Sequence, residues 1–250
     1  MTAFRDPATQ LAFSVPENRG VFSLLLGSGL SRAAEIPTGW EITTDLVRRV
    51  AKAQGVDEQD DWAKWYVETE GKEPNYSELL GQVASTPAER RAILHTYIEP
   101  NEEDREQGRK IPTAGHKAIA KLVRGGYVRV IVTTNFDRLM ENALREVGVE
   151  PTVVGSTDAL EGAEPITHSA CYILKLHGDY KDARILNTDS ELQTYPDAYN
   201  KLLDRIIDEH GLIVALSQDK VFNKTLEGVV MRHSVSLQQD LTFCADTREA

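Results

Sequence analysis

Short runs of apolar residues recur along the chain, each about as long as one β-strand. They cover residues 21–26, 128–132, 172–176 and 211–216, and residues 151–154 form a weaker fifth run. Continuous apolar runs of this length are typical of strands that are buried on both faces of a sheet. The pattern therefore predicts a sheet whose strands lie in the interior of the protein.

Between the apolar runs, hydrophobic residues recur at the spacing of an amphipathic helix. In residues 41–54, for example, Ile42, Leu46, Val47 and Val50 fall on one helical face, and residues 116–123, 136–147 and 198–210 show the same spacing. Strands that alternate with helices indicate an α/β fold, a Rossmann-like parallel sheet with helices on both faces. Ligands of such sheets bind at the carboxyl ends of the strands.

Two parts of the chain depart from this alternation. The stretch from about residue 55 to residue 110 has no strand-like run and is rich in charge and in Trp62, Trp65 and Tyr66. We expect a helical insertion at about residues 41–115 that packs as a small lobe, with a set of surface helices as the alternative. From Ser217 onward the alternation is lost. We therefore expect one domain over residues 1–216 and an irregular carboxyl-terminal tail over residues 217–250.

The charge balance narrows the classes of partner. The chain has 39 acidic residues against 28 basic ones, a net charge of -11. This argues against a nucleic-acid-binding surface, because neutralising phosphates requires a basic patch. The negative net charge does not exclude an anionic small ligand, since the backbone at a helix amino terminus can bind phosphate without lysine.

The sequence also limits the compartment and the metal chemistry. The amino-terminal residues lack a basic segment followed by a long apolar core, and no stretch approaches the ~18 apolar residues of a membrane span. We expect a cytoplasmic protein without a membrane segment. The two cysteines, Cys171 and Cys244, are too few for a four-cysteine zinc module or a disulfide framework, so no metal site is predicted.

A glycine-rich turn directly follows the first apolar run. It reads Gly27-Ser28-Gly29-Leu30-Ser31. Glycines at this point of a sheet let backbone N–H groups approach a phosphate. The alternative is a tight strand-to-helix turn with Ser28 or Ser31 as the helix N-cap. The turn differs from the dinucleotide fingerprint, because position 32 is arginine, and from a P-loop, because it has no lysine.

A second break in the pattern follows at Ile36-Pro37-Thr38-Gly39-Trp40. Proline and glycine interrupt the chain here before the helix predicted from residue 41. The segment is either a plain loop or a loop that closes over a ligand bound at the glycine-rich turn.

Polar residues cluster where the second strong strand ends, at Thr133-Thr134-Asn135-Phe136-Asp137. One interpretation is a capping box, in which Thr134 and Asp137 cap the next helix. Capping does not account for three polar groups at the carboxyl end of a buried parallel strand, which is where ligands bind. We therefore also expect a binding role for this segment.

His177 ends the run 172–176 and is followed by Gly178. It is the only one of six histidines at the end of a predicted buried strand. An imidazole titrates near neutral pH and can serve as a general base. The alternative is a histidine that bonds a backbone carbonyl. Because parallel strands end at one edge, the turn at Gly27, the segment at Asn135 and His177 are all expected at the same edge of the sheet.

These segments, in this order, resemble the motifs of the sirtuin superfamily over about residues 20–216. The corresponding family motifs are a glycine-alanine-glycine-x-serine turn, a glycine-isoleucine-proline loop, a threonine-glutamine-asparagine-x-aspartate segment and a histidine-glycine pair. The form here, with Thr-Thr-Asn and with Lys-Leu-His-Gly-Asp at residues 175–179, looks most like the sirtuin-like domains of bacterial anti-phage defence proteins, which lack the zinc-binding cysteines.

The resemblance implies a function. Such domains bind NAD and hydrolyse it to nicotinamide and ADP-ribose, which depletes NAD in an infected cell, and they often act as oligomers or with a partner protein. On this basis residues 1–216 are expected to be the NAD-binding domain. One departure is that the strand ending at Leu216 is followed by Ser217-Gln218-Asp219, without the glycine that the family usually has there.

The resemblance also assigns roles residue by residue. Asn135 and His177 would be catalytic: Asn135 would orient water or the ribose, and His177 would accept a proton. The phosphate and adenosine side of NAD would be bound by Gly27, Ser28, Gly29 and Ser31, and Asp137 would lie with Asn135 at the nicotinamide ribose. The other expected NAD-binding residues are Pro37, Trp40, Thr133, Thr134, Gly178 and Ser217.

Two other functions remain open from the sequence. A protein deacylase would also use NAD but needs a groove for an acyl-lysine peptide, which the zinc module usually borders. A non-catalytic module would bind NAD or ADP-ribose, or mediate assembly, without turnover.

Overall fold

The computed structural model describes residues 7–182, 195–215 and 242–244. Its centre is a six-stranded sheet in the order β3-β4-β2-β1-β5-β6, in which every neighbouring pair is parallel. The strands are β1 Phe22–Leu26, β2 Val128–Thr133, β3 Thr152–Val154, β4 Tyr172–Lys175, β5 Gly211–Ala215 and β6 Thr242–Cys244. The parallel sheet with helices on both faces confirms the predicted α/β fold.

The register of the sheet brings the ends of its central strands together. Leu26 at the end of β1 pairs with Thr133 of β2 on one side and with Ala215 of β5 on the other. Thr133 in turn pairs with Lys175 at the end of β4. The segments that follow β1, β2 and β4 therefore leave the sheet next to one another, as the parallel topology predicts.

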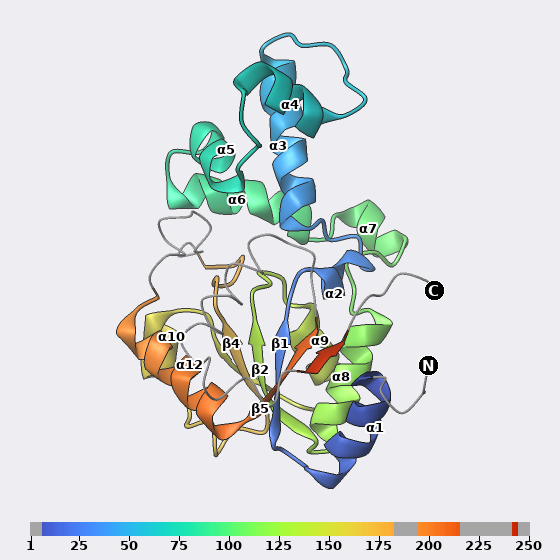
Figure 1. The fold of residues 1–250 in the computed structure, drawn as a ribbon, viewed down its shortest axis with the longest axis vertical. Coiled ribbons are helices and arrows are strands. Elements are labelled where there is room, and N and C mark those ends of the chain that lie inside the picture. Colours follow the sequence, from blue (N-terminus) through green and yellow to red (C-terminus); the bar gives the residue numbers. More distant parts are fainter. Residues whose placement is uncertain (1–6, 183–194, 216–241, 245–250) are drawn as a thin grey trace.

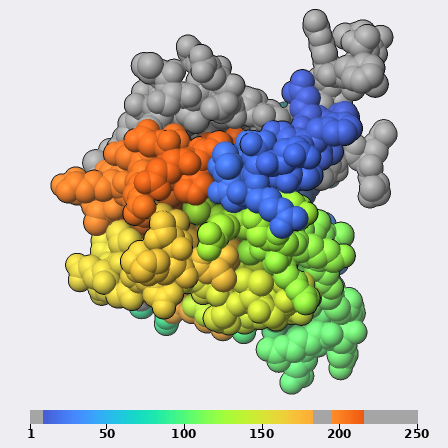
Figure 2. Space-filling model, turned by 90° about the horizontal axis from the view of Figure 1, so that it is seen from below, coloured from blue at the N-terminus to red at the C-terminus, as the bar shows by residue number. Residues whose placement is uncertain are grey.

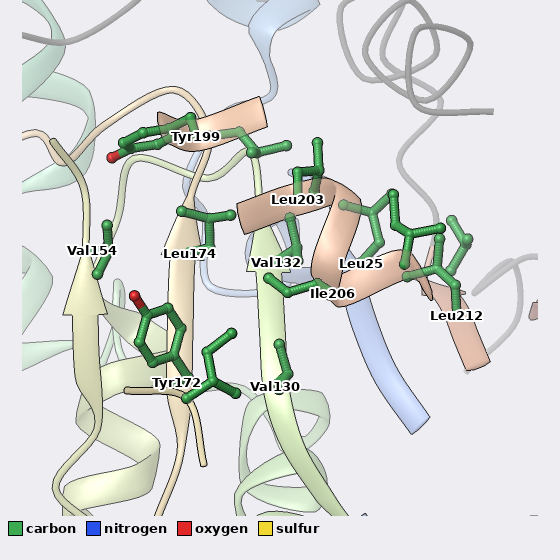
Figure 3. Packing of buried hydrophobic residues seen from close by; sticks show 14 residues of the cluster. Leu25, Val130, Val132, Val154, Tyr172, Leu174, Tyr199, Leu203, Ile206 and Leu212 are labelled. Carbon is green, nitrogen blue, oxygen red and sulfur yellow. The ribbon is translucent and has the colours of Figure 1, made fainter. Parts of the chain in front are cut away.

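One face of the sheet is covered by α12 (Asp197–Glu209) and α10 (Thr157–Glu161). Leu25, Val132 and Leu174, from β1, β2 and β4, contact Leu203 and Ile206 of α12 in one buried cluster (Figure 3). The helical spacing of residues 198–210 thus marks the face of α12 that packs on the sheet.

The other face is covered by α1 (Pro7–Glu17), α8 (Ala114–Arg124) and α9 (Leu139–Glu146) (Figure 1). Leu24 and Leu26 of β1 point to this side, opposite to Leu25, because successive side chains of a strand alternate between faces. They belong to a second buried cluster with Ala143 and Leu144 of α9. Burial on both faces explains why the strands appear as continuous apolar runs.

Residues 27–127, all described, contain helices and loops only. The helices are α2 Gly29–Arg32, α3 Gly39–Ala53, α4 Trp62–Glu70, α5 Tyr76–Val83, α6 Pro87–Ile98, α7 Glu102–Glu106 and α8, which covers the sheet. Helices α3 to α6 form a helical lobe around its own core, which includes Leu46, Leu80 and Leu94. Capping boxes at Thr38 and Thr86 define where α3 and α6 begin.

The helical lobe lies over the carboxyl edge of the sheet (Figure 1). Leu139 of α9 and Tyr180, in the loop after β4, are part of the lobe core. The lobe also reaches that loop through polar contacts, since Tyr180 donates a hydrogen bond to Glu99 and Arg91 donates to the carbonyl oxygen of Lys181. The segments that follow the strands are thus enclosed between sheet and lobe.

The opposite end of the molecule, where the strands begin, is seen in Figure 2, with amino-terminal residues (blue) beside α12 (orange). Of the predicted irregular tail, Thr242–Cys244 forms β6 at the edge of the sheet, next to β5. Across the parts of the chain that the structure describes, no helix combines the length and the apolar character of a membrane span.

Candidate functional site

The loop after β2 is attached to the end of β1. The hydroxyl of Thr133 donates to the carbonyl oxygen of Leu26 (3.2 Å), and the backbone N–H of Thr134 donates to the same oxygen (3.2 Å). The Thr133 hydroxyl also accepts from the backbone N–H of Asn135 (3.1 Å). These bonds turn the chain so that Asn135 faces the glycine-rich turn after β1.

Ser31 of α2 forms one buried hydrogen-bonded group with Asn135 and Asp137 of the loop after β2. The Ser31 hydroxyl donates to Oδ2 of Asp137 (2.7 Å) and accepts from Nδ2 of Asn135 (3.3 Å). The three side chains are at least nine-tenths buried. The structure therefore brings together three of the residues that sequence analysis predicted to bind NAD.

The other end of the Asn135 amide faces no protein donor. Its Oδ1 is buried and has no hydrogen-bond partner in the protein. Leaving a buried acceptor unpaired costs about 1–3 kcal/mol, so such atoms usually have a ligand or water as partner. The Nδ2 bond to Ser31 fixes which way the amide is turned, with Oδ1 as the acceptor available to a ligand hydroxyl or water.

The Thr134–Asp137 capping box, which we considered as an alternative, is not formed. Helix α9 begins at Leu139, not at residue 136, and Arg138 in its N-cap position makes no side-chain cap. Asp137 accepts from the backbone N–H of Leu139 through Oδ1 (2.9 Å), but its Oδ2 accepts from Ser31. Residues 134–138 are a loop because their polar groups bond to β1 and α2 rather than to one another.

The glycine-rich turn is positioned by β5 and α8. The Gly27 N–H donates to the carbonyl oxygen of Ala215 (3.3 Å), which continues the β1–β5 pairing past the end of β1. Ser28 is the N-cap of α2 but makes no side-chain cap, and Ser31 uses its hydroxyl on Asp137. A Cβ at Gly115 of α8 would come within 2.8 Å of the Leu30 side chain, so α8 supports α2 at close range.

The second predicted loop is only partly joined to this group. The N–H of Ile36 donates to the carbonyl oxygen of Ser31 (3.4 Å), and Pro37 follows half-buried. Thr38 and Gly39 begin α3, so Trp40 lies in the first helical turn with 42% of its surface exposed.

His177 lies just after β4 and is 3% exposed. Its ring faces that of Phe136, the neighbour of Asn135, with centroids 6.0 Å apart. Gly178 has a φ of 89°, a left-handed conformation that favours glycine and turns the chain away behind the histidine. Burial lowers the pKa of His177 to about 4, because a charged imidazolium would lose its hydration. The imidazole is thus neutral at neutral pH, and the lowered pKa makes it a weaker base than a free imidazole.

The lowered pKa predicts a specific pH dependence of stability. Between about pH 4 and pH 6.5 the unfolded chain binds a proton at His177 and the folded protein does not, so acid favours unfolding in this window. Wild type should lose about 3 kcal/mol more free energy of unfolding than His177→Gln when the pH is lowered from 7 to 4. Denaturant titrations of both proteins at the two pH values measure the difference, and an equal loss in both would contradict a buried neutral His177.

Residues 129–247 match the family model of the SIR2-like domain. The match starts in β2, covers β3 to β6 and contains Asn135, Asp137 and His177. It supports the predicted relationship to the sirtuin-like superfamily and suggests an activity related to NAD. The glycine-rich turn lies before the matched part. No curated protein matches the chain.

The part of the chain that matches the SIR2-like model contains buried charged residues to which the sequence assigned no role. Lys175, the last residue of β4, pairs with Glu141 of α9 (3.0 Å) and with Asp179 (3.1 Å), and Asp179 also pairs with Arg138 (2.8 Å). The signal in the sequence was a lysine inside an otherwise apolar strand, at a position where a charge is costly unless it is paired.

A second buried histidine also lies near this group. His116 of α8 is 1% exposed, and Asp137 acts on it electrostatically. Burial lowers the pKa of His116, and the carboxylate of Asp137 partly opposes this. The sequence predicts no role for His116, because nothing in the local pattern points to Asp137.

Two predictions remain, one for Ser217 and one for metal sites. Ser217, predicted to bind NAD, lies outside the described residues. Within residues 7–182, 195–215 and 242–244, no group of three or more His, Cys, Asp or Glu side chains is arranged to hold a metal ion.

Proposed function

We propose that this protein is an NAD+ glycohydrolase that cleaves the bond between nicotinamide and ribose, giving nicotinamide and ADP-ribose. The observation that carries the proposal is the buried group of Ser31, Asn135 and Asp137, in which Asn135 Oδ1 has no partner in the protein. The ring of Phe136, in the same loop, contacts that of His177. The relationship of residues 129–247 to the SIR2-like domain directs the proposal to NAD.

Cleavage of the nicotinamide–ribose bond needs little acid catalysis from the protein. Nicotinamide leaves as a neutral molecule, because the bond electrons neutralise its cationic ring, and the ribose develops positive charge. A water oxygen then bonds to the ribose carbon and loses one proton. Asn135 Oδ1 is the acceptor that can orient this water or a ribose hydroxyl, and neutral His177 can take the proton. Holding the reactants in place contributes most of the acceleration in such a scheme.

The diphosphate of NAD has a place in the same scheme. Gly27, Ser28 and Gly29 follow β1 at the edge where Asn135 and His177 lie, and Gly29 begins the short helix α2. Backbone N–H groups at such a turn favour an anion, despite the net charge of -11 of the whole chain.

Uncontrolled hydrolysis would deplete cellular NAD, so the proposal includes a role in anti-phage defence, with self-association or a partner protein as the means of control.

The test is to incubate purified protein with NAD, with and without an acetyl-lysine peptide, and to separate the products by chromatography. A glycohydrolase releases nicotinamide and ADP-ribose in equal amounts without the peptide. Release of nicotinamide only when the peptide is present would establish a deacylase instead. Binding of NAD in a calorimetric titration without any product would identify a binding module. Either of the last two results overturns the proposal.

A further inference from the structure

Lys175 is the most completely buried charged residue near the proposed site, with 1% of its surface exposed. Its ammonium lies within hydrogen-bonding distance of four oxygens. Two belong to carboxylates, Glu141 Oε1 (3.0 Å) and Asp179 Oδ2 (3.1 Å). The other two are the backbone carbonyl oxygens of Phe136 (3.3 Å) and Asp137 (2.5 Å). An apolar residue would be enough to end this strand, so these four contacts indicate a further role for Lys175.

Each charged side chain in the cluster around Lys175 is paired with one of opposite charge. The carboxylates of Glu141 and Asp179 hold the pKa of Lys175 above its usual value in spite of burial. Asp179 is in turn bound by Arg138 through both of its oxygens (3.0 and 2.8 Å) and by the backbone N–H of Lys181 (2.9 Å). The lysine therefore stays charged, and its hydrogen bonds to the two carbonyls are charge-assisted and strong.

The two carbonyls belong to the loop that carries the proposed site. The Phe136 carbonyl belongs to the peptide unit between Phe136 and Asp137, and it also accepts from the N–H of Tyr180 (3.1 Å), three residues after His177. Lys175 thus joins the loop after β2 to the loop after β4. Without the bonds from Lys175, the peptide units on both sides of Asp137 would lose their charged donor. The Asp137 carboxylate would then shift, and the Asn135 amide with it, because Ser31 bonds to both.

We propose that Lys175 is a positioning residue: by donating to the carbonyl oxygens of Phe136 and Asp137, it holds the Asn135 amide and the Asp137 carboxylate in the geometry that cleavage of the nicotinamide–ribose bond requires. This rests on the proposed function. Lys175 makes no contact with the reacting atoms in this scheme. Its effect on the reaction passes through the loop.

The test replaces the buried Lys175–Glu141 pair by neutral side chains of similar shape, Lys175→Met with Glu141→Gln. Asp179, the other carboxylate at Lys175, keeps its bonds from Arg138 and from the backbone N–H of Lys181. The matched control is Lys117→Met with Glu146→Gln, which removes a lysine–glutamate pair between α8 and α9 that is half exposed at 3.9 Å. Thermal unfolding, the kcat and KM of NAD hydrolysis, and the NMR signals of the Asn135 side-chain NH2 are measured for each protein, with kinetics well below every unfolding midpoint.

We expect the buried double variant to fold, to lose about 10- to 100-fold in kcat with little change in KM, and to shift the Asn135 NH2 signals, because a displacement of about 1 Å is enough for such a loss. The surface double variant should match wild type in all three. A folded buried variant with wild-type kcat or unmoved Asn135 signals would overturn the proposal, since a role in stability alone leaves both unchanged.

Two provisions keep the outcome decisive. If wild type does not hydrolyse NAD, the proposed function fails, and the Asn135 NH2 signals still decide whether Lys175 positions the amide. If the buried variant does not fold, Lys175→Gln with Glu141→Gln takes its place. The glutamine NH2 is one atom shorter in reach than the lysine ammonium, so kcat should fall and the Asn135 signals should shift in the same direction. Wild-type values in that variant would equally overturn the proposal.

Discussion

Replacing His177 with glutamine is expected to lower the rate of NAD hydrolysis by about 10²-fold, the low end of the usual contribution of a general base, because a pKa of about 4 makes this imidazole a weak base. Glutamine keeps a polar side chain of similar length but cannot accept a proton from water. The imidazole it replaces is buried and neutral, so the substitution removes no charge at neutral pH. The measurement is the initial rate of nicotinamide release by wild type and variant.

The control for this variant is His168→Gln, which changes an exposed histidine before β4. It should hydrolyse NAD as wild type does. Both variants should show the far-ultraviolet circular dichroism of wild type, which establishes that they are folded. Undiminished turnover by folded His177→Gln would remove the histidine from the mechanism while leaving NAD binding to be tested separately.

Replacing Asn135 with alanine is expected to lower kcat about 10²-fold, because a water or ribose hydroxyl that has lost its orienting acceptor reacts through a poorly aligned geometry. The structural cost should be small, about 1 kcal/mol, since one neutral hydrogen bond to Ser31 is lost and the Ser31 hydroxyl keeps its bond to Asp137. Removing Oδ1 costs no bond within the protein, because that atom has no protein partner.

Asn142→Ala is the matched control for this prediction. It removes an exposed asparagine from α9, the helix that follows the Asn135 loop. Activity and stability of this control should remain near those of wild type. If Asn135→Ala kept full activity, or if the two variants lost activity equally, the unpartnered Oδ1 would have no role in the reaction.

The sheet could be predicted from the sequence because its strands are buried on both faces. Such strands appear as uninterrupted apolar runs, and the ends observed for β1, β2, β4 and β5 lie within one residue of those predicted. The edge position of the site followed from parallel topology alone. The start of α9 was placed three residues too early, because Phe136 fits the helical spacing although the polar groups of Thr133 and Asp137 bond elsewhere.

The internal arrangement of the site could not be predicted in the same way. Ser31 and Asp137 are 106 residues apart, and nothing in either local pattern indicates that one hydroxyl lies between an amide and a carboxylate. The direction in which the Asn135 amide is turned depends on that hydroxyl. The role of Lys175 likewise depends on partners from α9 and from the loops after β2 and β4, which only the folded chain brings together.

The central claim is that NAD binds where the loops after β1, β2 and β4 meet. A crystal structure of the His177→Gln variant with NAD tests it most directly, because slow turnover should leave the substrate intact. We expect the diphosphate at Gly27 to Gly29 and a hydrogen bond from the nicotinamide ribose or its attacking water to Oδ1 of Asn135. NAD bound at any other surface, or no NAD at a saturating concentration, would contradict the account.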